Sequence, residues 1–529
     1  MPSKGEFDFI VVGAGPAGCA TAARLAMLRP DASVLLLETG PAESGLRSDV
    51  PLGIATLVPF RNARNYSYRT VPQAALHGRR GVQPRGRGLG GSSLINAMIY
   101  VRGQHADYDD WARLGAIGWA WRDVFPYFLR SEDNARGADA WHATGGPLAV
   151  RDLASPSECA RAFVAAAVEC GHPSNPDFNG ASQEGVGLYQ VFQRDGRRWN
   201  AARAYLDGLK PGNLSVRAEA QVARVLVAEG RARGIACANG DTYGARAEVV
   251  LSAGAFGTPQ LLMLSGIGPA EHLRALGIAV RHDSPEVGAN LQDHADFVIS
   301  RSVDDHGLFG TVPSIVPQVL RAIAPFRRGT GLLTSNVAEA GGFLRTRQEL
   351  ERPDIQLHLC IGIVDNHSRR LHATRGMSLH TCVLRPHSRG SVRLAGADVR
   401  KAPRIDPAFL ADPRDMDTLV AGVGLARRIL AAPAFARYAG PALYDAETTD
   451  EARLRETIRA HADTIYHPVG TCRMGSDASA VVDPELRVRG VAGLRVADAS
   501  VMPSLISGNT QAACAMIGER AAEFLAAGD

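Results

Sequence analysis

The chain lacks most of the features that place a protein in a special class. Its 529 residues carry a formal net charge of only +4, and 6% of them are aromatic. No apolar run reaches the roughly 18 residues that a membrane-spanning helix needs. A small net charge without a basic stripe of interleaved aromatic residues gives no reason to expect a nucleic-acid partner. Composition therefore predicts an ordinary globular protein that is long enough for two domains.

Cysteine is scarce and shows no paired spacing. The eight cysteines contain no C-x-x-C pair; they are residues 19, 159, 170, 237, 360, 382, 472 and 514. This pattern favours a reduced, cytoplasmic protein over a disulfide framework. The first predicted strand begins at Phe7, which leaves no room for a secretory signal ahead of it. Clustered Cys/His spacings and an H-E-x-x-H pattern are also missing from the sequence, so no metal site is predicted.

The beginning of the chain is its most informative part. Apolar strands are predicted over Phe7–Val12 and Val34–Leu37, with a helix over Ala20–Leu28 between them. A G-x-G-x-x-G turn joins the first strand to the helix, and Glu38 follows the second strand. This arrangement is typical of a βαβ unit that binds a dinucleotide.

Each residue of this motif has a physical task. Gly13 permits the tight turn, Gly15 lets the backbone approach a pyrophosphate, and Gly18 lets the helix pack closely on the sheet. The helix N-terminus supplies N–H donors to the phosphates. Glu38 lies twenty residues after Gly18, where its carboxylate can accept hydrogen bonds from the ribose hydroxyls of an adenosine. We therefore predict a dinucleotide site here.

The rest of the chain shows two kinds of pattern. Further strands and an apolar-faced helix that suit the nucleotide domain are predicted at Val222–Val227, Glu248–Ser252, Leu494–Val496 and Gln511–Ala526. Strand-like runs alternate with polar turns in the middle of the chain, at Ile355–Leu359, Met377–Val383 and Gly390–Leu394, with a helix at Asp415–Leu430. Such alternation indicates an antiparallel sheet that carries helices.

These patterns predict an α/β protein with a discontinuous nucleotide domain. A Rossmann-like domain is expected to comprise residues 1–155, 215–300 and 455–529. An inserted α+β substrate domain, built on the antiparallel sheet, is expected over residues 300–455, and residues 156–214 are expected to be mixed. Ligand sites commonly lie between two such domains, so we expect the active site there.

Several long motifs stand in a recognisable order. They are Gly88–Asn96 (GLGGSSLIN), Gly254–Gly268 (GAFGTPQLLMLSGIG), Gly288–His294 (GANLQDH), His467–Gly475 (HPVGTCRMG) and Asp498–Gln511 (DASVMPSLISGNTQ). With these motifs and the βαβ unit, essentially the whole chain resembles the glucose–methanol–choline (GMC) oxidoreductases, which bind FAD and oxidise alcohols. Within that family it looks most like bacterial FAD-dependent alcohol, sorbose and choline dehydrogenases.

The resemblance implies a set of residues that hold FAD. Gly90, Gly91 and Ser92 offer N–H groups and a hydroxyl where a flavin or its phosphates can rest. By the resemblance, Asn96 and its neighbouring backbone reach the isoalloxazine ring, and Val222 contacts the adenine through its main chain.

Two further positions bear on the cofactor. Asp498 resembles the family acid near the pyrophosphate and ribityl chain, with an N-cap for the following turn as the alternative. Some family members attach FAD through a histidine in the GLGGSSLIN segment. Ile95 takes that place here, and no histidine lies between Gly86 and Gly103. FAD is therefore expected to be bound non-covalently.

The resemblance also implies the catalytic residues. Removing hydride from an alcohol carbon requires a base for the hydroxyl proton, and histidine suits that task near neutral pH. The family motif places this base at His467. The family places a second polar group, His or Asn, shortly before an Ile-Gly pair. Counting back without a gap from Ile517 and Gly518 puts this position at Gln511, which departs from the family pattern. Asn509 is the alternative, and the count favours Gln511.

The sequence thus predicts FAD-dependent oxidation of a primary, polyol or sugar-like alcohol to the carbonyl, by hydride transfer to flavin N5. An oxidase that uses oxygen is the alternative of the same fold, and a nicotinamide-dependent dehydrogenase is a more remote one. The expected partners are a small alcohol and an electron acceptor, which is a quinone, another carrier or oxygen. The apolar stretch Val312–Ala324, followed by Arg327 and Arg328, predicts a segment that covers the active site or, as the alternative, a peripheral membrane contact.

Overall fold

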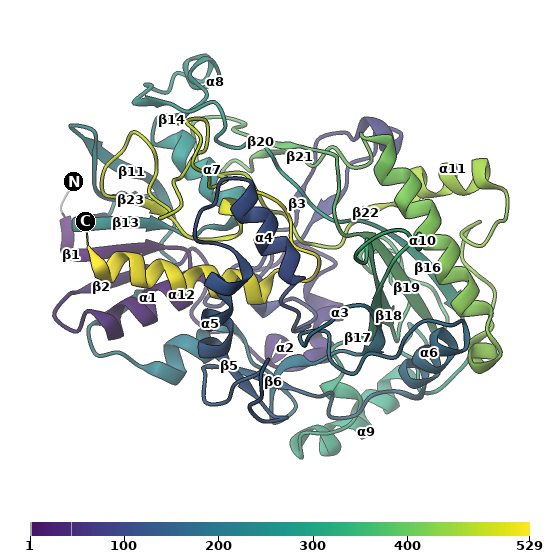
Figure 1. Cartoon of the computed structure of the whole chain (residues 1–529). Coiled ribbons are helices and arrows are strands. Elements are labelled where there is room, and N and C mark those ends of the chain that lie inside the picture. Colours follow the sequence, from purple (N-terminus) through teal and green to yellow (C-terminus); the bar gives the residue numbers. More distant parts are fainter. Residues whose placement is uncertain (1–2, 44, 529) are drawn as a thin grey trace.

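A seven-stranded sheet carries the glycine-rich turn. The computed structural model of the protein describes residues 3–43 and 45–528, and Figure 1 shows this sheet at one end of the molecule. Its strands run in the order β10, β2, β1, β13, β12, β11, and β23 also pairs with β13. The bounds are β1 (Ser3–Val12), β2 (Val34–Leu37), β10 (Leu214–Arg217), β11 (Val222–Ala228), β12 (Arg231–Cys237), β13 (Thr242–Leu251) and β23 (Leu494–Val496). Because β1 pairs in parallel with both β2 and β13, the predicted βαβ unit is present.

Two helices pack together against this sheet. α1 (Pro16–Leu28) follows the glycine turn, and α12 (Gln511–Ala527) brings the C-terminal end of the chain back beside it (Figure 1). A Cβ added at Gly518 would lie 2.3 Å from the Ala17 carbonyl oxygen, so glycine permits this close approach. α1 begins at Pro16, earlier than the predicted Ala20, because proline is tolerated in the first turn of a helix.

A second sheet of six antiparallel strands lies at the other end of the molecule (Figure 1). Its order is β22 (Asp463–Thr464), β16 (Ala295–Ser302), β19 (Gly376–Val383), β18 (Ile355–Cys360), β17 (Ala338–Leu344) and β7 (Gly185–Leu188). Helices α6 (Glu158–Glu169) and α10 (Pro413–Ala431) pack against this sheet. Their buried side chains and those of the sheet form one apolar cluster.

The two faces of this sheet differ in polarity. On β18, Ile355, Leu357 and Leu359 join the apolar cluster beneath α10. The alternate residues Gln356 and His358 therefore project from the opposite face, because neighbouring side chains of a strand point to opposite sides. Every residue of β18 is buried, so the polar face also lies inside the molecule.

One strand and two domain boundaries differ from the sequence prediction. The strand predicted at Gly390–Leu394 is β20 (Ser391–Arg393), which pairs with β21 (Arg404–Asp406) in a separate two-stranded sheet. The boundary predicted near residue 300 falls inside β16, and the one near residue 455 falls inside α11 (Glu451–His461). The expected mixture in residues 156–214 fits the sheet order, since β7 joins the antiparallel sheet and β10 begins at Leu214 in the other. The division into domains stays a prediction.

Shorter elements complete the described chain. The other helices include α2 (Leu46–Asp49), α3 (Ile54–Leu57), α4 (His105–Arg113), α5 (Trp121–Ser131), α7 (Gly254–Leu264), α8 (Ala270–Ala275) and α9 (Ile315–Arg327). The other strands include β3 (Tyr68–Arg69), β4 (Val82–Gln83), β5 (Glu132–Asn134), β6 (Leu148–Arg151), β8 (Val191–Arg194), β9 (Arg197–Arg198), β14 (Ile267–Gly268) and β15 (His282–Asp283). No helix within residues 3–43 and 45–528 has both the length and the apolar character to cross a bilayer.

Candidate active site

A cavity of about 910 Å³ is lined from both sheets. The ends of β1 and β2 contribute Gly13, Gly15 and Glu38, while β18 and β19 contribute His358 and His380. This volume lies near the upper end of the range for small-molecule and cofactor sites, about 300–1,000 Å³. The cavity is therefore large enough for a cofactor, and it lies where the sequence places the site.

The three glycines of the turn are required for different reasons. A Cβ at Gly13 would lie 2.4 Å from the Ser252 carbonyl oxygen, and one at Gly18 would lie 1.9 Å from the Gly13 carbonyl oxygen. Contacts within the protein therefore leave no room for a side chain at Gly13 or Gly18. A Cβ at Gly15 would meet nothing within 4 Å, although Gly15 lines the cavity. A phosphate close to the backbone explains glycine at this position, so the turn fits a dinucleotide.

Glu38 fixes the loops around the nucleotide end of the cavity. Its Oε2 accepts a hydrogen bond from Ala14 N at 3.0 Å, and its Oε1 accepts from Gly40 N at 2.8 Å and Gly88 N at 3.0 Å. Burial raises the pKa of the carboxyl, and the three N–H donors act in the opposite direction. Two carboxylate oxygens offer about four acceptor positions, so one remains for a ribose hydroxyl.

The second glycine segment packs directly against the first. Gly90 N donates to the Ala14 carbonyl oxygen at 2.8 Å, and a Cβ at Gly91 would lie 2.7 Å from the Gly15 Cα. Gly91 and Ser92 line the cavity, and the Ser92 hydroxyl accepts from Gly86 N at 3.1 Å. These contacts bring the two predicted cofactor segments to one site.

Asn96 lies between a buried cation and Gln511. Its Nδ2 donates to Gln511 Oε1 at 2.5 Å, while Arg198 Nη1 donates to Asn96 Oδ1 at 2.9 Å. Among the described residues, the Gln511 Nε2 is buried without a partner and belongs to a residue that lines the cavity. A buried donor without a partner is costly, so this amide is expected to bond a ligand.

Val222 and Asp498 also line the cavity. Val222 is the first residue of β11, and its side chain is buried. The Asp498 Oδ2 accepts from Gly254 N at 2.8 Å and from Thr258 Oγ1 at 2.6 Å, so the carboxylate secures the start of α7. Its Oδ1 accepts from Ser500 N, which caps the following turn as the alternative interpretation predicts.

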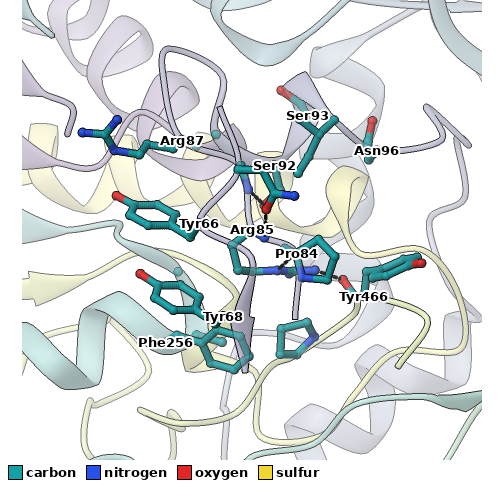
Figure 2. Close-up of a pocket in the computed structure, with 18 of the residues that line it drawn as sticks. Tyr66, Tyr68, Pro84, Arg85, Arg87, Ser92, Ser93, Asn96, Phe256 and Tyr466 are labelled. Carbon is teal, nitrogen blue, oxygen red and sulfur yellow. Dashed lines mark hydrogen bonds between the residues drawn. The ribbon is translucent and has the colours of Figure 1, made fainter. Parts of the chain in front are cut away.

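A row of aromatic rings borders the same cavity. Figure 2 shows Tyr66, Tyr68 and Phe256 one after another along its wall. The rings of Tyr66 and Tyr68 are stacked with centroids 5.0 Å apart, and Tyr68 meets Phe256 edge to face at 6.1 Å. Arg85 lies beside this row and donates to the Tyr466 carbonyl oxygen, one residue before His467. Burial lowers the pKa of Arg85 to about 10.

His467 lies buried in the cavity wall with both ring nitrogens bonded. Its Nδ1 is 2.9 Å from His294 Nδ1, and its Nε2 is 3.2 Å from Asn509 Nδ2. Its backbone N donates to Asp293 Oδ1 at 2.9 Å. Burial, reinforced by His294 and His358, holds the pKa of His467 well below its ordinary value. The imidazole is therefore neutral at neutral pH and has the protonation state of a base.

Of the two candidate partners of this histidine, the one in contact is Asn509. The Asn509 amide bonds His467 directly, and Gln356 Nε2 donates to Asn509 Oδ1 at 3.0 Å. Gln511, which the ungapped count favours, bonds Asn96 instead. The geometry therefore favours Asn509, because the turn before α12 brings residue 509 to the histidine.

Sequence reasoning missed four residues of the site. His294 and Asp293 belong to the GANLQDH segment, which carried the resemblance, but no role was assigned to them. His358 is 3% exposed and lines the cavity, and both of its ring nitrogens lack a partner among the described residues. Burial lowers the pKa of His358 to about 3. Arg198, which holds Asn96, stands in a segment without any motif.

A dinucleotide-binding turn that opens into a cavity with a buried, neutral histidine is the arrangement expected of a dinucleotide-dependent oxidoreductase. Two family models described as GMC oxidoreductase match residues 7–296 and 386–518. An alcohol dehydrogenase [acceptor] of Pseudomonas putida is 43% identical, over 98% of this chain and 95% of its own length. An oxygen-dependent choline dehydrogenase of Sinorhizobium fredii is 40% identical, again over 98% of this chain and 95% of its own length.

Solved structures agree with this assignment. Pyridoxine 4-oxidase from Mesorbium loti matches with a TM-score of 0.87 and 32% identity, over 98% of both chains. A fungal aryl-alcohol oxidase matches with a TM-score of 0.85 and 25% identity, over 99% of both chains. The chain belongs to the GMC oxidoreductase family. Members of this family carry FAD, which is therefore the cofactor of this protein.

The absence of a linking histidine predicts how FAD can be released. Ile95, at the position of the linking residue, is buried and lines the cavity. Acid precipitation of the holoprotein should therefore leave FAD in the supernatant, which absorbance at the flavin bands will show. A yellow pellet that keeps its flavin after washing would reveal a covalent bond, for which the histidines lining the cavity would be the candidates.

Proposed function

We propose that this protein uses FAD to oxidise a primary alcohol to the carbonyl, with His467 as the base. The observation that carries the proposal is the neutral His467 beside Asn509 in a cavity whose far end fits a dinucleotide. Bound FAD would accept the hydride at flavin N5. The residues of the chain bind and orient the alcohol, remove its hydroxyl proton and exclude water.

The hydrogen-bond chain supports Nε2 as the basic nitrogen of His467. The Leu384 carbonyl oxygen can only accept, so the bond of 3.0 Å to His294 Nε2 requires a proton on that nitrogen. His294 has a pKa lowered to about 3 by burial, so it is neutral and its Nδ1 must accept. His467 Nδ1 therefore donates to it, and His467 Nε2 keeps its lone pair.

The other end of the chain gives the same assignment. Tyr189 OH donates to the Leu357 carbonyl oxygen at 2.7 Å, so its oxygen accepts from Gln356 Nε2 at 3.2 Å. The second N–H of that amide donates to Asn509 Oδ1, which leaves the Asn509 NH₂ group facing His467 Nε2. Two backbone carbonyls thus fix the same tautomer from opposite sides.

The alcohol oxygen would replace the long contact between Asn509 and His467. A distance of 3.2 Å is at the upper end of the hydrogen-bond range, so little is lost when a hydroxyl comes between the two groups. The hydroxyl would donate its proton to His467 Nε2 and accept from Asn509 Nδ2. The proton and the hydride then leave the alcohol in opposite directions, and the product is the neutral carbonyl compound.

We infer that the antiparallel sheet forms the substrate-binding domain and that the substrate body is neutral and apolar. Ile99, Val337, Ala338, Cys360 and Val364 belong to or pack against one apolar cluster and also line the cavity. His358 lies on the same sheet and offers a neutral polar anchor. The sheet itself contributes His358 and His380 beside Ala338 and Cys360, so this wall combines apolar side chains with two histidines, and the apolar body of the substrate would lie against the cluster.

Charge argues against a quaternary ammonium substrate. His380 Nδ1 is 2.7 Å from Asp296 Oδ2, and this carboxylate outweighs burial and holds the pKa of His380 well above its ordinary value. The carboxylates among the described lining residues are Glu38 and Asp498, which bond backbone N–H groups at the nucleotide end. A cation has no counter-charge at the substrate end, so choline should bind poorly.

The electron acceptor and the cellular location belong to the same proposal. The reduced cofactor would pass its electrons to a quinone, another carrier or oxygen. A cytoplasmic location and a peripheral membrane contact at residues 312–324 stay predictions.

A panel of alcohols tests the function and the substrate class. We expect medium-length primary alkanols to bleach the flavin of the anaerobic holoprotein, and choline to bleach it much more slowly. Admission of air then separates an oxidase, which reoxidises rapidly, from a dehydrogenase. Faster reduction by choline would refute the apolar site but not alcohol oxidation, whereas an FAD-loaded protein that no alcohol bleaches would refute the proposed function.

Two amide variants test which side chain holds the alcohol oxygen. Asn509→Ala should slow flavin reduction on the order of 10-fold or more, because one hydrogen bond to the reacting oxygen contributes roughly 1–3 kcal/mol. Gln511→Ala should lose less, since its contact is Asn96. Stopped-flow reduction of both variants under anaerobic conditions makes the comparison. A slower Gln511→Ala variant with full FAD occupancy would restore Gln511 as the partner.

A further inference from the structure

Helix α9 lies at the outer edge of the molecule (Figure 1), and part of its apolar surface is exposed to solvent. Val316 and Leu320 are each 60% exposed, and Ile323 is 39% exposed. Their spacing places them on one side of the helix. The opposite side holds the helix in place, because Ala322 and Phe326 pack with Leu52 and Leu333 in a buried cluster. The exposed apolar face is therefore not needed for packing within the chain.

The charges within the segment that carries this face have one sign. From His306 to Ala338 the sequence contains no aspartate or glutamate, and its arginines are Arg321, Arg327 and Arg328. All three arginines are exposed. Acidic residues border the segment outside it: Asp304 pairs with Arg375 at the start of α9, and Asp195 lies near Gly329 at its end.

The apolar face is close to the wall of the active-site cavity. Val337 packs against the cluster that holds α9, and it also lines the cavity. Leu52 belongs to that cluster, and Ile54, two residues later, lines the cavity as well. A surface that covered α9 would therefore lie beside the cavity.

We propose that α9 docks on the surface of an anionic lipid bilayer, with Val316, Leu320 and Ile323 inserted among the acyl chains. An apolar stripe flanked by arginines is the pattern of helices that lie in the membrane interface. A second copy of this chain fits less well, because a two-fold interface would bring its like-charged arginines together. Such a contact does not depend on the role of His467.

The FAD-loaded full chain can be tested by co-sedimentation with vesicles. We expect it to bind vesicles of phosphatidylcholine mixed with phosphatidylglycerol, and to bind pure phosphatidylcholine weakly. Added salt should release it, because salt screens charges at the surface. Arg321→Gln/Arg327→Gln should weaken binding on the order of 30-fold, since each arginine near an anionic surface contributes about 1 kcal/mol.

Variants that introduce negative charge locate the contact. Val316→Glu/Leu320→Glu should abolish sedimentation while flavin reduction in solution stays unchanged. Leu114→Glu/Ile117→Glu is the matched control, because these two residues are also exposed but lie near α4. Equal loss in the control, or unchanged binding of the α9 variant, would overturn the assignment of the surface. So would sedimentation velocity that shows a dimer dissociated by Val316→Glu/Leu320→Glu, because the partner would then be a second copy.

Discussion

His467→Ala is expected to reduce its flavin about 10²–10⁴-fold more slowly than the unchanged protein, which is the usual effect of losing a general base. This corresponds to roughly 3–5 kcal/mol of transition-state stabilisation. FAD binding and the fold should persist, because the cofactor contacts of the glycine turn and Glu38 lie at the other end of the cavity. The measurement is anaerobic stopped-flow reduction, with a substrate deuterated at the reacting carbon.

The variant His467→Gln serves as its control. A glutamine can still hold the substrate oxygen but cannot take its proton, so it should be nearly as slow as alanine. If it recovers most of the rate, His467 orients the alcohol and another group accepts the proton. If His467→Ala itself reduces at close to the original rate, with an intact flavin spectrum, the assignment of the base is wrong.

The pH dependence supplies a second readout for the same residue. Protonation removes the base, so the rate should fall as the pH falls through the pKa of His467. Since burial lowers this pKa well below 6.5, the fall should occur at more acidic pH than for an ordinary histidine. Flavin reduction should therefore stay level from pH 8 to below pH 6.5. A midpoint near 6.5 or above would contradict the buried, neutral state of the imidazole.

The nucleotide end of the site could be predicted because local constraints dominate it. Gly18 is required by a contact within the turn, and Gly13 has a φ of 103°, which favours glycine there. The turn and the helix after it connect two strands, β1 and β2, with a fixed parallel pairing. Glu38 follows from the same geometry, because β2 runs parallel to β1 and ends beside it. In such a unit, the spacing of residues along the chain largely determines how they are arranged in space.

The catalytic end could be predicted only in part, because its residues come from distant segments. His467 was found through a motif, but the bond from His294 crosses 173 positions of the sequence. The choice between Asn509 and Gln511 depended on the shape of one turn before α12, and an ungapped count does not contain that shape. His358 was missed because its strand was interpreted only as part of an antiparallel sheet, although Gln356, His358 and Cys360 alternate with leucine and isoleucine and so share one face.

Glu38→Arg is expected to yield a protein that neither retains FAD nor folds to its original stability. The substitution leaves the N–H groups of Ala14, Gly40 and Gly88 without their acceptor, and each unpaired buried donor costs roughly 1–3 kcal/mol. Their sum is a large fraction of the 5–15 kcal/mol that typically stabilises a domain. The substitution also removes the acceptor position of the carboxylate that remains for the ribose, and it places a cation there.

The milder Glu38→Gln separates the two effects of that change. A glutamine keeps one acceptor oxygen, so part of the loop network should survive, whereas its amide replaces the oxygen that faces the ribose. We expect this variant to fold with a moderately lowered midpoint of denaturation and to bind FAD on the order of 10-fold more weakly, as the loss of one charged hydrogen bond implies. FAD titration of the apoprotein and chemical denaturation measure the two quantities independently. If Glu38→Gln binds FAD as tightly as the original protein but unfolds more easily, Glu38 organises the loops and does not hold the ribose, because the cofactor would not sense the missing charge.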